Sequence, residues 1–410
     1  MFMSVESINL NTYKVKQLLD VRCELIYWKQ GTYTPCYRQS GFYSCRMIMN
    51  VLILNSAQSK YLVGNDPWIQ ASIKTVRTLA ERCVHLLCST DPSPWSLVTY
   101  LAGHMRMNIN LIVKYDADEA GYQEFARLKE DFALDENRTF PLFFGVPSTA
   151  HYKKAWKIRD QYALKTADCV YPVSIKPGGR LDTLLSKGDF KAEIRNDFRI
   201  EWTVQKHKND YDFTRCLINP FPAGNWLVHW TRASQGPWPG EKSREFYRDL
   251  IMHPTIYVRS AEETLIKILT DHTIRGSSWK IPSGESAVSF TSLDPDEAVH
   301  LMRWRKRFVR YSFEPFGIGI KHEVLAGKGV KKIRYETIQQ NTALTQRLFS
   351  HAPGQNGHWT KEDEWRIQGE LRLDDIERDD MVVIVPDETT AGRIRSRTGR
   401  EYSIHVLFRY

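Results

Sequence analysis

The stretch MNVLILNSAQSK (Met49–Lys60) decides how the first half of this 410-residue chain folds. Its first eight residues form a short, mainly apolar run, which is typical of a buried strand. A loop and a helix pattern, WIQASIKTVRTLAERC, follow. Further strand runs at Val84–Ser89, Ile109–Tyr115, PLFFGVP and CVYPVSI alternate with helix-like segments. This alternation predicts an α/β, doubly wound parallel sheet with helices on both faces.

Three loops of this sheet are candidates for phosphate binding, because ligands of such folds sit at the carboxyl ends of the strands. Asn55–Lys60 is rich in hydroxyl and amide groups, and Ser89–Trp95 is expected to end at a helix N-terminus, which favours anions. Lys176–Arg180 places two glycines between two cations. The candidate nucleotide-binding residues are Ser56, Lys60, Ser89, Thr90, Arg159, Gly178 and Gly179.

The length of the chain predicts two domains. The segment Asp197–Asp212 is polar and lacks a periodic pattern, so we place the boundary at about residues 200–220. The expected parts are an N-terminal extension at residues 1–45, a Rossmann-like domain at 46–205 and an α+β domain at 215–410.

The net charge of +9 favours anionic partners such as nucleic acid or nucleotide phosphates, although general solubility explains it equally well. Seven cysteines without a CxxC pair argue against a disulfide framework and a zinc site, and no other metal site is readable. No apolar run of 18 residues and no signal peptide pattern are present. We therefore expect a cytoplasmic protein with no membrane partner.

The second half follows a different order of elements. NWLVHWTR (Asn225–Arg232) reads as a strand, and the helix SAEETLIKILTDHTIRG begins with Ser260 as N-cap and Glu263 as its capping-box partner. This helix is expected to present His272 on its apolar face and to end at Gly276. AVSFTSL is a strand, DPDEAVHLMRWRKRFVRY a helix, and FGIGIKHEVL, GVKKIRYE, EWRIQGELRL and MVVIVP follow.

An acidic triplet opens the late segment HWTKEDEWRIQGELRL at residues 358–373. Successive side chains of a strand point to opposite faces, so Glu362, Glu364 and Arg366 share one face while Asp363 turns to the other. Taken alone, such a triplet is a solvated surface or a site.

A basic run, RWRKRFVR, holds five cations in eight residues. In the expected helix, Arg303, Arg307 and Arg310 fall on one side, as in a surface that tracks nucleic-acid phosphates. Alternatively, Trp304 and Phe308 pack into the core and the arginines are solvated.

The first half resembles the SLOG superfamily of Rossmann-like domains, which includes DNA-processing proteins and nucleotide phosphoribohydrolases. The likeness spans about residues 49–186 and rests on Arg159, on Ala167–Asp168 in a strand and on Gly178–Gly179 in a following loop. The loop departs from the SGG or PGG-GT pattern of that group. The resemblance therefore implies nucleotide binding or sensing rather than catalysis.

The second half resembles the ADP-ribosyltransferase superfamily over about Leu227–Pro386. A strand with H-x-T, the helix pattern ETLxxILxxxxIRG, the strand VSFTS and a late E-x-E carry the likeness, and VSFTSL, FGIGIKHEVL and EDEWRI are similar to abortive-infection proteins. The catalytic set of the family is commonly His-Tyr-Glu or Arg-Ser-Glu, and the chain lacks an assured tyrosine. The resemblance implies a transferase that consumes NAD in antiviral defence or as a toxin.

The same resemblance implies a role for each residue at the matching positions. Glu364 would stabilise the cationic ribose, Glu362 would deprotonate or orient the nucleophile, and His229 would bind the adenosine-side ribose. Thr231 and Ser292 would support the nicotinamide half. The implied NAD-binding residues are His229, Trp230, Thr231, Arg232, Thr291 and Ser292.

The acceptor of ADP-ribose would be nucleic acid, a protein side chain or water, and an antitoxin or phage protein is a further expected partner. Two alternatives remain at this point. One is a nucleotide sensor without catalysis. The other is an N-glycosidic nucleotide hydrolase that acts through Asp66, Asp91 or Asp168 of the first half.

Overall fold

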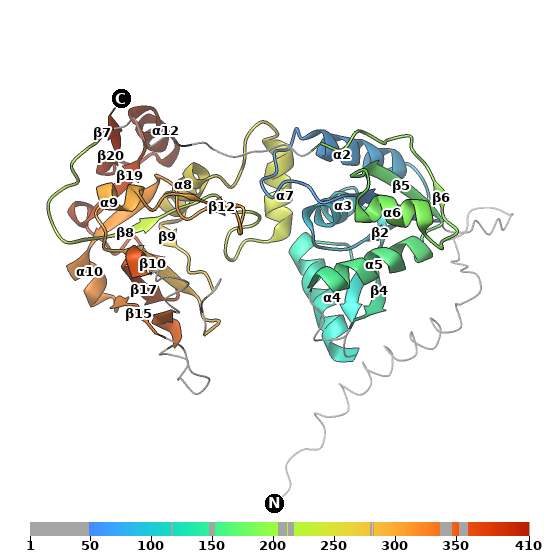
Figure 1. The fold of residues 1–410 in the computed structure, drawn as a ribbon, viewed down its shortest axis with the longest axis horizontal. Helices are drawn as coiled ribbons and strands as arrows, with labels where there is room; N and C mark the ends of the chain where they lie inside the picture. The colour runs from blue at the N-terminus through green and yellow to red at the C-terminus, as the bar shows by residue number, and fades with distance from the viewer. Residues whose placement is uncertain are drawn as a thin grey trace, which may run out of the picture. The chain divides into compact units, whose positions relative to one another are not determined.

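The computed structural model describes residues 49–115, 118–146, 152–203, 211, 217–278, 281, 283–336, 347–351 and 360–409. The N-terminal extension expected at residues 1–45 lies outside the described residues. The chain divides into two compact units, shown in Figure 1. Unit 1 comprises residues up to 57 and residues 67–203, and unit 2 comprises residues 58–66 and 204–410. The grouping of residues 58–66 with unit 2 has no signal in the sequence.

Unit 1 contains a six-stranded parallel sheet in the order β4-β3-β2-β1-β5-β6. Its strands are β1 (Met49–Asn55), β2 (Val84–Cys88), β3 (Asn108–Tyr115), β4 (Thr139–Gly145), β5 (Cys169–Ser174) and β6 (Glu193–Ile194). Its helices are α2 (Pro67–Ala80), α3 (Ser93–His104), α4 (Asp118–Phe132), α5 (Tyr152–Thr166) and α6 (Arg180–Lys187). Val51 and Leu52 point to opposite faces of β1 and are both fully buried, so both faces of the sheet are covered. The predicted parallel α/β sheet is confirmed.

The strand order of unit 1 reverses at β1, which lies between β2 and β5. Ligands of open parallel sheets bind at such a reversal, outside the carboxyl ends of the strands. The loops that follow β1 and β5 meet there, because the Lys176 N–H donates to the Ser56 hydroxyl over 2.9 Å.

Unit 2 contains a seven-stranded sheet in the order β14-β17-β10-β8-β13-β19-β20, in which only the β19–β20 pair is parallel. Its strands are β8 (Trp226–Trp230), β10 (Ala287–Thr291), β13 (Gly317–Lys321), β14 (Lys331–Lys332), β17 (Glu364–Gln368), β19 (Met381–Val385) and β20 (Ile404–Val406). Its helices are α7 (Ser243–Met252), α8 (Ala261–Asp271), α9 (Pro295–Val299), α10 (His322–Gly327) and α12 (Glu388–Thr398). Short β-pairs lie outside this sheet.

The predicted helix α8 is present and begins as expected, since the Ser260 hydroxyl accepts the Glu263 N–H over 3.1 Å. The Glu263 carboxylate binds Arg397 of α12 instead of closing a capping box. The helix also ends earlier than predicted. His272 adopts a left-handed conformation with φ of 50° and terminates the helix, so it does not continue the apolar face toward Gly276.

The helix predicted through the basic run is wrong, because α9 ends at Val299 and a hairpin follows. Its strands are β11 (Trp304–Arg305) and β12 (Arg310–Tyr311). The rings of Trp304 and Tyr311 face each other across the hairpin, with centroids 5.2 Å apart. This contact between residues seven apart is available to a hairpin and not to a straight helix, and Val309 in the turn has a φ of 53°.

Candidate functional site

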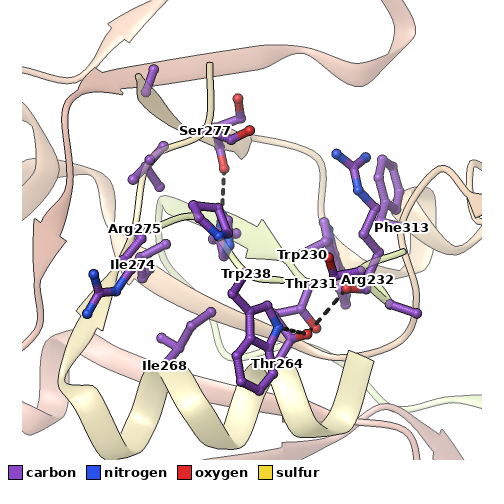
Figure 2. Close-up of a pocket in the computed structure, with 18 of the residues that line it drawn as sticks. Trp230, Thr231, Arg232, Trp238, Thr264, Ile268, Ile274, Arg275, Ser277 and Phe313 are labelled. Carbon is purple, nitrogen blue, oxygen red and sulfur yellow. Dashed lines mark hydrogen bonds between the residues drawn. The ribbon is translucent and has the colours of Figure 1, made fainter. Parts of the chain in front are cut away.

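A cavity of about 1180 Å³ lies in unit 2 where strands β8 and β10 diverge. The two strands share a single ladder pair, Thr291 with Val228, whereas β10 pairs with β17 over five residues. Helix α8, the loop after β8 and the β11–β12 hairpin complete the wall. Figure 2 shows part of this wall, with the Trp238 ring beside α8 and its Nε1 donating to the Thr264 hydroxyl over 3.0 Å.

Glu364, at the start of β17, is held in a fixed position on the cavity wall. Arg366 binds both of its carboxylate oxygens, over 2.8 and 3.0 Å, and the Ser289 hydroxyl donates to it over 2.7 Å. Arg366 is 3% exposed and also donates to the Leu348 carbonyl over 2.8 Å. The carboxylate therefore meets the cavity in one orientation. The predicted shared face of Glu364 and Arg366 is present.

Glu362 also lines the cavity. The prediction that it lies in the strand is wrong, because β17 begins at Glu364. It ends a 3₁₀ turn, η3 (Thr360–Glu362), and Asp363 has a φ of 40°, so the chain turns sharply before β17 begins. Burial, with the neighbouring negative charge of Glu364, raises the pKa of Glu362 to about 7. An Arg305 nitrogen lies 3.6 Å from its carboxylate.

Asp363 turns away from the cavity, as its place in the alternation predicted. Its carboxylate accepts a hydrogen bond from the Ser292 hydroxyl and forms an ion pair with Lys332 over 2.7 Å. The Ser292 hydroxyl also accepts from the Trp365 indole over 3.3 Å. Ser292, expected beside the nicotinamide half of NAD, does not belong to the cavity lining. Its side chain instead fixes the turn before β17.

His229 of β8 lines the cavity as a neutral ring. Its Nδ1 lies 2.8 Å from the Ser289 carbonyl oxygen, which can only accept, so Nδ1 carries the proton. Burial lowers the pKa of His229 to about 4. The remaining nitrogen, Nε2, is consequently a hydrogen-bond acceptor at neutral pH.

Two expected NAD contacts use their hydroxyls inside the protein. Thr231 is 3% exposed, and its hydroxyl lies 3.0 Å from the Ala261 carbonyl oxygen and 3.1 Å from that of Phe316. The Thr291 hydroxyl donates to the Glu362 carbonyl over 2.6 Å. Both residues line the cavity, and both position its wall rather than offering a free hydroxyl. Trp230, a further expected NAD contact, also packs within the protein: it is 9% exposed and stacks on Phe313.

Three arginines reach the cavity from β8 and the hairpin, namely Arg232, Arg305 and Arg310. Burial lowers the pKa of each, that of Arg310 to about 10, and Arg232 and Arg310 disfavour each other's charge. Arg303 and Arg307, expected on the same helix side as Arg310, are exposed and do not belong to the cavity lining. The hairpin pairs Arg305 with Arg310, whereas Arg303 lies before β11 and Arg307 lies in the turn.

Arg159 of unit 1, expected to bind nucleotide, is 2% exposed and has internal partners. Its guanidinium binds Asp160 over 2.9 Å, donates to the carbonyls of Thr90 and Asp91, and stacks on the Trp95 ring at 4.4 Å. Arg159 therefore fixes the loop after β2.

The other candidate groups of unit 1 are similarly used. The Ser89 hydroxyl donates to a carbonyl of β3 over 2.9 Å. The Gly178 N–H donates to the Asp182 carboxylate over 2.9 Å, so the N-terminus of α6, which Gly179 precedes, already faces an anion. Lys60 is exposed.

The three carboxylates of the alternative hydrolase have separate surroundings, and Asp66 belongs to unit 2. Asp168 precedes β5 at the amino end of the sheet and accepts the Asn50 N–H over 2.7 Å. Asp66 is 2% exposed and accepts the Val63 N–H over 3.2 Å. Asp91 lies after β2 with a φ of 45°.

Several residues of the site have no assignment from the sequence. Ser289 could have been found, because it lies two residues before Thr291 and so shares its strand face. Tyr335, whose hydroxyl lies 3.3 Å from the Glu364 backbone nitrogen, comes from a separate short strand, and Arg305 comes from the hairpin. Trp238 lies in the loop after β8. Long-range contacts bring the last three to the site.

No protein-family model matches this chain, and no curated protein or solved structure matches it. Among the described residues, no group of three or more His, Cys, Asp or Glu side chains is arranged to hold a metal ion. Within that same part of the chain, no helix has both the length and the apolar character needed to cross a membrane.

Proposed function

We propose that unit 2 breaks the bond between nicotinamide and ribose in NAD and transfers ADP-ribose to an acceptor. The observation that carries this proposal is the pair of carboxylates on one cavity wall with unlike surroundings. Glu364 is bound by Arg366, whereas Glu362 has a pKa raised to about 7. Two carboxylates with distinct environments are typical of glycosidic bond cleavage.

Glu364 would act on the sugar. When the C1′–N bond breaks, nicotinamide leaves with the electron pair and positive charge develops on the ribose. A fixed carboxylate next to that charge stabilises the transition state without reorganising. The two Arg366 bonds and the Ser289 bond supply this fixed orientation.

Glu362 would act on the acceptor. A group with a pKa near 7 is suited to remove a proton at neutral pH. The acceptor oxygen attacks C1′, and its proton passes to the Glu362 carboxylate. Among its cationic neighbours, Arg305 lies 3.6 Å from the Glu362 carboxylate, which is too long for a strong hydrogen bond and leaves the carboxylate able to bind the acceptor.

The cavity suits a dinucleotide in size and in polar groups. Its volume of about 1180 Å³ is at or above the upper end of typical small-molecule sites. The unprotonated Nε2 of His229 can accept a hydrogen bond from a ribose hydroxyl. The resemblance of the sequence to ADP-ribosyltransferases assigns the same role to this residue.

The acceptor proposed first is nucleic acid, because the chain carries a net charge of +9 and exposes Arg303 and Arg307 beside the cavity hairpin. Water is the acceptor in the absence of a polymer. By resemblance, the setting is a cytoplasmic defence or toxin protein.

A second candidate function for unit 1 is nucleotide sensing. The loops after β1 and β5 meet at the reversal of strand order, through the bond between Lys176 and Ser56. This is the position at which related sheet topologies bind nucleotides.

One experiment separates these functions. The pure protein is incubated with NAD, with and without a single-stranded oligonucleotide, and free nicotinamide and labelled oligonucleotide are followed. Wild type should release nicotinamide, and Glu364→Gln should not, whereas the exposed control Glu370→Gln should behave as wild type. Release that persists in Glu364→Gln contradicts the assignment to unit 2, and absence of release in wild type leaves the sensor as the better account.

A further inference from the structure

We infer that Arg232, Arg305 and Arg310 form a subsite for two linked phosphates, so the substrate of the cavity is a diphosphate-containing nucleotide. This inference deepens the proposed function and rests on it for the position of the ribose. Two of the three arginines come from the β11–β12 hairpin, which the sequence predicted to be helical.

The hairpin is a two-sided element. Arg305 and Arg310 are directly paired across it, so their side chains leave on the same face, and both line the cavity. Trp304 and Tyr311 leave on the other face, although part of Tyr311 also lines the cavity. Trp304 lies against Tyr61 and Tyr311 against Tyr211, with ring centroids 6.2 and 5.4 Å apart. These aromatic contacts anchor the hairpin in unit 2, and its two paired arginines line the cavity.

Further contacts fix both ends of the hairpin. At its tip, the Gln235 side-chain amide donates to the carbonyls of Phe308 and Val309 over 3.1 and 2.6 Å. At its base, the Arg232 guanidinium donates to the Ser312 carbonyl over 3.1 Å. The three arginines are consequently positioned before any ligand arrives, which lowers the entropy lost on binding.

Positive charge exceeds negative charge at this wall. Of the nearby acids, Glu364 is paired with Arg366, and Glu314 accepts hydrogen bonds from the Ala233 N–H and the Tyr211 hydroxyl over 2.7 and 2.8 Å. Glu362 is about half protonated at neutral pH. Apart from the Glu364–Arg366 pair, three guanidinium groups therefore meet two carboxylates, those of Glu314 and Glu362. An anionic ligand offsets the remaining positive charge, and the planar guanidinium matches phosphate oxygens in pairs.

The subsite also orients the substrate. Arg305 lies 3.6 Å from Glu362, so phosphates bound by Arg305 lie next to the acidic end of the cavity. A ribose attached to that diphosphate is then within reach of Glu362 and Glu364. A nucleoside without phosphates lacks this anchor, so the subsite selects dinucleotides over nucleosides.

Direct binding tests this subsite without any glycosidic cleavage. ADP, inorganic pyrophosphate and adenosine are titrated calorimetrically into wild type, Arg305→Ala and Arg310→Ala. We expect each variant to bind ADP and pyrophosphate about ten- to hundredfold more weakly, with the adenosine affinity unchanged. Lys306→Ala, in the turn of the same hairpin, removes an exposed cation outside the cavity lining and should stay within about twofold of wild type.

Arg305→Lys separates loss of contacts from loss of the hairpin, because it retains the charge and the backbone. It should weaken ADP binding by about tenfold, since lysine lacks the paired donors. Equal affinities of wild type for ADP and adenosine, or equal losses in Lys306→Ala and Arg305→Ala, would overturn the inference.

The two proposals fail separately. Glu364→Gln should bind ADP as wild type does. Weak ADP binding in the arginine variants without nicotinamide release by wild type supports the subsite and contradicts the proposed function. Release of nicotinamide by a protein that does not bind ADP supports the proposed function and contradicts the subsite.

Discussion

The loops of unit 1 and the cavity of unit 2 use similar residues in opposite ways. In unit 1, Arg159 binds a carboxylate and two carbonyls within the protein, and the Gly178 N–H binds Asp182. In unit 2, Glu362 and Arg305 lie on the wall of one cavity, 3.6 Å apart. The first set is used to hold the loops in place. The second set lines a cavity that a ligand can enter.

This difference shows what separates a binding motif from a structural one. A polar residue after a parallel strand is a candidate only until its partners are known. Single substitutions distinguish the two kinds of residue, through changes in the free energy of unfolding or in the rate of nicotinamide release.

Arg159→Ala should destabilise the protein by about 2–3 kcal/mol, because it removes buried hydrogen bonds to two carbonyls and to Asp160, whose remaining partner is Arg180. Urea unfolding followed by circular dichroism measures this loss. The control Arg127→Ala removes an exposed ion pair with Glu124 and should cost less than about 1 kcal/mol. A stable Arg159→Ala that loses nucleotide binding would place function in unit 1 after all.

Glu362→Gln should change how stability depends on pH. The pKa of Glu362 in the folded state, about 7, exceeds the ordinary carboxyl value, so the folded state binds the extra proton and wild type loses stability as pH rises to about 7. The variant should therefore gain on wild type between about pH 4.5 and pH 7, by on the order of 3 kcal/mol at most. His229 titrates in both proteins and cancels in the difference.

The same carboxylate should control the rate at which ADP-ribose is transferred to the acceptor. Wild-type activity should rise with pH through about 7, as Glu362 loses its proton, and Glu362→Gln should lack this rise. A parallel pH profile in both proteins would exclude Glu362 as the base.

Ser289→Ala should lower nicotinamide release by about ten- to hundredfold, since it removes a hydrogen bond to the charged Glu364. Arg366 remains, so NAD binding should change little. Steady-state kinetics distinguish the two effects: kcat should fall while KM stays near that of wild type. A rise in KM alone would assign Ser289 to substrate binding.

Gly178→Ala should have the smallest effect. The residue has a φ of 66°, where a side chain costs about 1 kcal/mol, and nothing lies within 4 Å of the added methyl group. Nicotinamide release should be unaffected. A large loss of nucleotide affinity in unit 1 would show that this loop binds ligand despite its bond to Asp182.

The sequence predicts those parts of the fold that depend on local pattern. The apolar runs predicted strands β1 to β5, and Ser260 marked the start of α8. Strand β6 (Glu193–Ile194) has only two residues, both exposed, and carries no apolar run. The basic run fits a helix by spacing, and contacts with distant residues, such as Gln235 at the tip and Arg232 at the base, hold it as a hairpin.

The candidate site divides in the same way. Alternation along one strand predicted that Glu364 and Arg366 share a face, because the two residues are close in sequence. The turn at Asp363 and the divergence of β8 from β10 are not local, and they bring Glu362, His229 and the hairpin to one cavity. No single segment contains that information.

The most direct test of the central claim measures NAD binding and nicotinamide release on the same sample of Glu364→Gln. If Glu364 stabilises the cationic ribose, the variant should bind NAD within about threefold of wild type and release nicotinamide at least about a thousandfold more slowly. Retained release, or loss of binding in step with loss of release, would contradict the account.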